Sequence, residues 1–102
     1  MDIDNSLVTD AGKFIDMPAE EFKEWIVSCH MTVGQCNNYV FALSSIFNTL
    51  VTQKDALLKV YEKEKSEEVL DTIKGIYAEL IKIEEKAVCL TERAKELLEK
   101  GV

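Results

Sequence analysis

Residues 69–97 read VLDTIKGIYAELIKIEEKAVCLTERAKEL, and their spacing determines the fold. Their apolar stripe recurs at alternating steps of four and three, and it consists of Val69, Ile73, Ile76, Leu80, Ile83, Ala87, Leu90, Ala94 and Leu97. Such heptad spacing puts the stripe on one side of a helix and is typical of a coiled coil. Ser66 in the N-cap position and Gly101 just past the last periodic residue predict a long helix over residues 66–100.

A second long helix is predicted over residues 32–65. Thr32 and Gln35 have the spacing of a capping box. The stripe that follows also steps by four and three, and it consists of Cys36, Val40, Leu43, Phe47, Leu50, Leu57 and Tyr61. Lys54 occupies the position that this stripe lacks. It reaches the edge of the seam, or it pairs with a carboxylate across the seam, or it sets the register or the oligomeric state.

The two long helices are matched in length, each about 50 Å at about 1.5 Å per residue. The turn between them falls in the polar stretch 62–66. Matched lengths and a short turn predict an antiparallel hairpin.

A shorter helix is predicted ahead of the hairpin, over residues 17–31. Asp16 stands at its expected N-cap and Pro18 in its first turn. One buried stripe follows at helical spacing, formed by Phe22, Trp25, Ile26 and Cys29. Residues 1–16 lack periodicity, and we expect an irregular arm. The predicted fold is therefore all-α: a short N-terminal helix and a long antiparallel helical hairpin in a single domain over residues 1–102, packed into an oligomeric bundle.

The net charge of the chain limits the classes of partner that it can bind. The chain has 12 basic and 19 acidic residues, a formal net charge of −7. Nucleic-acid binders concentrate Lys and Arg in a patch, whereas here Arg93 is the single arginine and the lysines alternate with glutamates. We therefore expect no direct nucleic-acid binding. Residues 25–53 carry no formal charge, but their amides and hydroxyls make them too polar to cross a bilayer, so no membrane contact is expected.

The sequence shows no constellation of residues for catalysis, cofactor binding or metal binding. Cys29, His30, Cys36 and Cys89 are the nearest approach to a zinc site, but no C-x-x-C pair exists, and adjacent residues on a helix point about 100° apart. We interpret the cysteines as small apolar core residues. Three cysteines and the absence of a signal-peptide pattern favour a reducing cytoplasm.

A second apolar stripe on the helix over residues 66–100 is formed by Leu70, Tyr77, Ile81 and Val88. Together the two stripes cover more of the helix than one partner helix can bury. The second stripe is therefore covered by the short N-terminal helix, by another copy of the chain or by a partner. Because the N-terminal helix is short, we expect a homo-oligomer, a dimer or higher, with these four residues at its interface.

An uncharged face on the helix over residues 32–65 lies opposite its apolar stripe. We predict that this face binds a protein partner through Asn37, Asn38, Phe41, Ser45, Asn48 and Thr52, with Phe41 as the anchor. Depletion of charge is typical of the core of an interface. Two other interpretations stay open: the N-terminal helix and arm cover this face, or it lines a small-molecule pocket.

These surfaces lead to the expected function, a non-enzymatic protein-interaction module. The chain would be a small acidic inhibitor or adaptor of a larger macromolecular partner. In composition it is similar to virus-encoded inhibitors that block host machinery. The alternative is an oligomer that sequesters a small molecule or nucleotide in pockets between protomers, lined by His30, Asn37, Asn38 and Tyr39.

Overall fold

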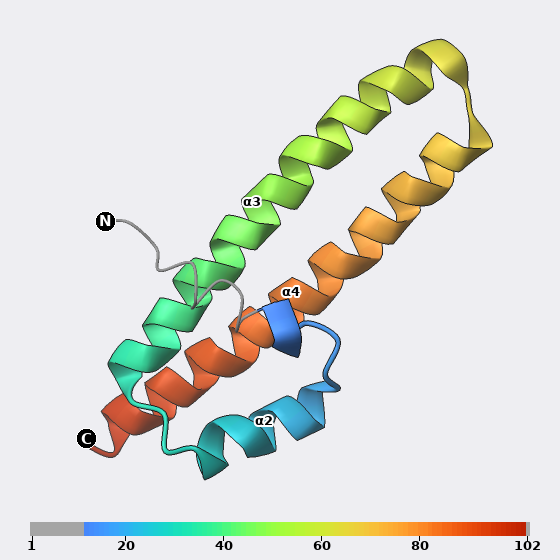
Figure 1. Ribbon diagram of the computed structural model, residues 1–102. Helices are drawn as coiled ribbons and strands as arrows, with labels where there is room; N and C mark the ends of the chain where they lie inside the picture. The colour runs from blue at the N-terminus through green and yellow to red at the C-terminus, as the bar shows by residue number, and fades with distance from the viewer. Residues whose placement is uncertain (1–11, 102) are drawn as a thin grey trace.

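The computed structural model describes residues 12–101. Within them the chain forms α2 (Ala19–Ser28), α3 (Val33–Glu64) and α4 (Glu67–Glu99), with a short helical segment at residues 12–14 and no strand. Helices α3 and α4 run antiparallel, and α2 lies beside the half of the hairpin that holds the C-terminal part of α4 (Figure 1). The predicted all-α class and its long hairpin are confirmed. Most of the expected arm lies outside the described residues, and packing with further copies stays a prediction.

The ends of α3 follow from local chemistry. The Thr32 side chain accepts a hydrogen bond from the Gln35 backbone N–H at 3.1 Å, and the Gln35 side chain accepts one from the Thr32 N–H at 2.9 Å. This is the predicted capping box. At the other end Lys65 adopts a left-handed conformation with φ 53°, and its N–H donates to the Tyr61 carbonyl at 2.8 Å. That residue ends α3 and allows α4 to start two residues later.

Two predicted caps differ from the structure. Asp16 does not cap α2, because Pro18 is the N-cap residue and the Asp16 carboxylate instead accepts from Lys82 Nζ on α4 at 2.9 Å. Ser66 holds the N-cap position of α4, but its side chain makes no capping hydrogen bond. The long-range ion pair of Asp16 therefore fastens the segment before α2 to the hairpin.

The main hydrophobic core lies where α2 meets the hairpin. Its buried residues are Ile15, Phe22, Ile26, Met31, Cys36, Ala42, Leu43, Ile83, Cys89, Leu90 and Ala94. The fully buried residues of α3 all fall between positions 36 and 43. Toward the turn, where α2 does not reach, the seam is held by partly buried α3 residues against α4 alone (Figure 1). Local opening should therefore begin at the turn end of the hairpin.

Aromatic rings join the N-terminal elements to α3. The Phe14 and Trp25 ring centroids lie 4.2 Å apart, and Tyr39 on α3 meets both rings edge-on at 6.4 and 6.3 Å. Offset and edge-on pairs contribute about 0.5–1.5 kcal/mol each beyond their buried area. This cluster fixes α2 against the start of α3, and it leaves the opposite side of α3 uncovered by α2.

Lys54 lies in the seam with its side chain 17% exposed. Its Nζ pairs with Asp55 Oδ1 at 3.1 Å and lies 5.4 Å from the centre of the Tyr77 ring on α4. The hydrogen bond to Asp55 raises the pKa of Lys54. The carboxylate partner is thus on the same helix, whereas the contact across the seam is with an aromatic ring.

We expect Leu90→Ala to lower the free energy of unfolding by about 2–5 kcal/mol, because the Leu90 side chain is fully buried in the main core and its loss leaves a cavity. Urea unfolding followed by circular dichroism measures the change. Leu98→Ala is the matched control, since Leu98 is 63% exposed and should lose less than about 0.5 kcal/mol. An equal loss of unfolding free energy in the two variants would contradict the assignment of Leu90 to the core.

Candidate interaction surfaces

The uncharged face of α3 contains a large exposed aromatic side chain. Phe41 is 64% exposed. Around it the predicted partner-binding residues Asn37, Asn38, Asn48 and Thr52 are exposed, and Ser45 is partly buried. Helix α2 packs mainly against α4, so it does not cover Phe41. We call this set of six residues the Phe41 surface.

The polar side chains on and beside this surface differ in the hydrogen-bonding groups that they leave available to a partner. The Thr52 hydroxyl donates to the Asn48 backbone carbonyl at 3.0 Å. The neighbouring Thr49 hydroxyl donates to the Ser45 carbonyl at 3.1 Å. The protons of these two threonine hydroxyls are therefore used within α3, and the amides of the exposed asparagines can donate to and accept from a partner.

The second apolar stripe of α4 also faces outward. Ile81 is 64% exposed, Val88 50% and Tyr77 47%, while Leu70 is partly buried. Helix α2 does not cover these side chains, because it packs against the neighbouring side of α4, where Cys89 is buried. One of the three sequence-based explanations, cover by the N-terminal helix, is therefore wrong. Cover by a second copy or by a partner stays a prediction.

The structure brings the two predicted surfaces to one side of the hairpin. A groove of about 180 Å³ runs between α3 and α4. Its walls include Ser44 and Asn48, three and seven residues after Phe41. The facing wall includes Glu84, three residues after Ile81 and four before Val88. Residues three and four apart are neighbours on a helix surface, so the Phe41 surface and the α4 stripe flank the same groove.

Among the described residues, the hollow that contains His30 does not include the other residues of the predicted small-molecule pocket. His30 lines a hollow of about 460 Å³ with Met31, Thr32, Val33, Gly34, Arg93 and Leu97. Tyr39 packs instead against Phe14 and Trp25, and neither Asn37 nor Asn38 lines that hollow. A pocket between protomers stays an untested prediction.

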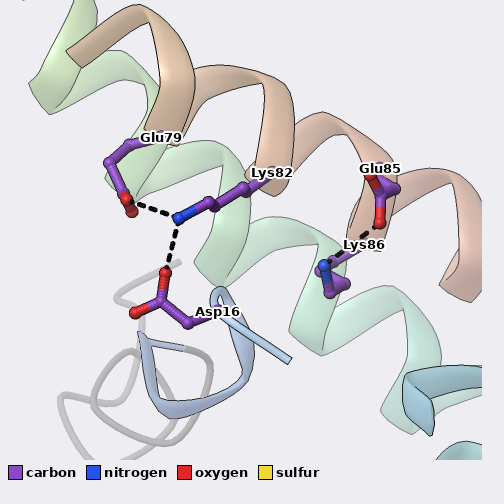
Figure 2. Close-up of polar contacts among 5 residues, drawn as sticks. All are labelled: Asp16, Glu79, Lys82, Glu85 and Lys86. Carbon is purple, nitrogen blue, oxygen red and sulfur yellow. Dashed lines mark hydrogen bonds and ion pairs between the residues drawn. The ribbon is translucent and has the colours of Figure 1, made fainter. Parts of the chain in front are cut away.

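Two lysines of α4 form separate ion pairs (Figure 2) and differ sharply in exposure. Lys82 Nζ pairs with Asp16 at 2.9 Å and Glu79 at 3.3 Å near the surface, and these hydrogen bonds raise its pKa. Lys86 is only 2% exposed, and its Nζ lies 3.4 Å from Glu85 Oε1. Sequence reasoning missed this buried charge. The available signal in the sequence was its position beside the apolar stripe, three residues after Ile83. In the structure, that position lies on the side of α4 where α2 packs.

The cysteines are free, with Cys36 and Cys89 buried and Cys29 exposed. Burial raises the pKa of the Cys36 and Cys89 thiols. Among residues 12–101, no group of three or more His, Cys, Asp or Glu side chains is arranged to hold a metal ion. In the same residues, no helix combines the length and apolar character that a bilayer span requires.

Comparison with protein-family models, curated protein sequences and solved structures found no match to this chain.

We expect Cys29 to react with a maleimide at pH 8 at least about a hundredfold faster than Cys36 or Cys89. A raised pKa leaves less thiolate at a given pH, and the two buried thiols react only after local opening. Mass spectrometry of labelled peptides over time measures the three rates. Full denaturation should equalise them, whereas equal rates in the native chain would contradict the burial of Cys36 and Cys89.

Lys86→Met should leave the free energy of unfolding unchanged or raise it by up to about 4 kcal/mol, because it replaces a buried ammonium with an apolar side chain of similar volume. Glu85→Gln should lower it by about 1–3 kcal/mol, since the buried charge then loses its partner. Chemical unfolding of both variants checks the pair. A clear loss of stability in Lys86→Met would mean that the charge itself is needed.

Proposed function

We propose that this chain is a non-enzymatic protein-interaction module, a small acidic inhibitor or adaptor that binds a larger macromolecular partner through the Phe41 surface. The observation that supports this most is the 64% exposure of Phe41 within a face of uncharged amides and hydroxyls. An aromatic ring surrounded by groups that cost less to desolvate than charges do has the character of an interface anchor.

The energetics of the surface favour association. Burying a Phe side chain contributes about 1.5–3 kcal/mol relative to leaving it exposed. Exposed charges nearby would oppose this by their desolvation cost, but the six residues of the Phe41 surface carry none. Asn37 and Asn48 can exchange hydrogen bonds with water for hydrogen bonds with a partner, which supplies specificity.

The charge and the thiols support the remaining parts of the proposal. A net charge of −7 disfavours nucleic acid as the partner and favours a protein with a basic region. The described cysteines are free, which suits a reducing cytoplasm.

The test is a capture experiment with matched variants of the full chain. Wild type, Phe41→Asp and Leu98→Asp are immobilised and exposed to lysate of the native host, and retained proteins are quantified by mass spectrometry. Leu98 is the matched control because it is 63% exposed, is also apolar, and lies outside the Phe41 surface. We expect at least one protein to be retained by wild type and Leu98→Asp and lost with Phe41→Asp.

Circular dichroism of the same variants separates binding from folding. Phe41→Asp should keep the helicity and the melting temperature of wild type, because the side chain is exposed. Loss of helicity in Phe41→Asp would show that Phe41 is part of a core. Retention of the same proteins by all three chains would contradict the Phe41 surface as the binding site.

A further inference from the structure

A second groove runs along the other flank of the exposed α4 stripe, between α4 and α2. Two adjoining hollows of about 380 and 180 Å³ share Lys23, Cys89 and Glu92, and together they extend along α4 from Ile81 to Glu96. That distance is about 22 Å at about 1.5 Å per residue. The apolar residues of the groove are Ala19, Ile26, Val27, Ile81, Val88 and Cys89.

The rim of this groove exposes large apolar side chains. Ile81 and Val88 stand on the α4 side, and Val27, 48% exposed, stands on the α2 side. Ile81 and Val88 are seven residues apart, which places them two helical turns apart in nearly the same direction. A partner helix parallel to the groove would meet both with residues of its own at the same spacing.

The charges around the groove are mainly acidic. Its lining includes four carboxylates, those of Glu84, Glu85, Glu92 and Glu96. Two of them already have a cation, since Glu85 pairs with Lys86 at 3.4 Å and Glu96 pairs with Arg93 at 3.3 Å. Among the described residues, Glu84 and Glu92 make no ion pair, whereas the groove's Lys23 pairs with Glu20 on its own helix at 3.6 Å.

We propose that this groove binds a basic amphipathic helix of a partner protein. The apolar face of that helix packs on Ile81, Val88 and Val27, and its Lys or Arg residues pair with Glu84 and Glu92. Opposite charges flanking an apolar contact fix orientation and exclude acidic partners. The proposal does not depend on the Phe41 surface, which lies on α3.

A second copy of the chain fits the groove less well. Each copy would bring a further charge of −7. An antiparallel contact in which Ile81 meets Val88 of the other copy also brings Glu84 and Glu85 close to the same residues of the other copy, and such like charges repel. A basic helix neutralises these carboxylates instead.

The test uses synthetic peptides of about 18 residues, long enough for about five helical turns. The probe peptide has Leu on one helical face and Lys on the others. One control has the same composition in an order without an apolar face, and another has Glu in place of every Lys. Isothermal titration calorimetry with the full wild-type chain should show the probe binding at least about tenfold more tightly than either control.

Variants of the full chain locate the site. Val88→Asp and the double variant Glu84→Lys, Glu92→Lys should each weaken binding of the probe at least about tenfold. The double variant should bind the Glu peptide more tightly than wild type does, and Phe41→Asp should bind the probe as wild type does. Circular dichroism checks that each variant keeps its helicity.

Four outcomes would overturn the proposal. They are binding of the scrambled peptide as tight as that of the probe, unchanged binding by Val88→Asp, loss of probe binding in Phe41→Asp, and self-association of the wild type that Val88→Asp removes. Sedimentation equilibrium detects the last outcome, which would make a second copy the occupant. Because Phe41→Asp serves as a control here, failure of this proposal and failure of the proposed function are distinguishable.

Discussion

Helix α4 carries apolar side chains on more of its circumference than α2 and α3 can cover. Helix α3 packs along one side of α4 and α2 along the next, which buries Ile83, Cys89 and Leu90. The remaining side leaves Ile81 and Val88 at least half exposed. Both grooves described above lie at the edges of this uncovered side, so both grooves follow from incomplete coverage of a single helix.

The two ends of the hairpin differ in packing because α2 covers α4 at one end only. At the end where α2 packs, three helices and the rings of Phe14, Trp25 and Tyr39 form a closed core. Toward the turn only α3 and α4 meet. The seam there includes Lys54, which pairs with Asp55 on the same helix. The exposed stripe begins near this two-helix part and continues into the three-helix part. The rigid end therefore presents the proposed binding residues on well-packed helices, which limits the ordering cost of association.

Regular spacing made the helices predictable, whereas contacts between distant residues did not follow from it. The heptads from Val69 to Leu97 and the capping box at Thr32 gave α3 and α4 to within a residue or two. Asp16 was misplaced as a cap because its partner, Lys82, is far away in the sequence. The exposure of Phe41 could be expected from periodicity, but the two grooves could not, since they depend on how α2 and α3 are placed around α4. Lys86 was missed because a lysine is ordinarily solvated.

Solvent exposure of the α4 stripe can be measured directly in the isolated chain. Paramagnetic relaxation by a soluble nitroxide, measured for methyl groups over a range of protein concentrations, compares Ile81 and Val88 with Ile83 and Leu90. We predict strong relaxation of Ile81 and Val88 at every concentration and weak relaxation of the two buried residues. Protection of Ile81 and Val88 at the lowest concentration would mean that the chain covers its own stripe. Protection that grows with concentration would mean that a second copy covers it, and either result would contradict an uncovered face of α4.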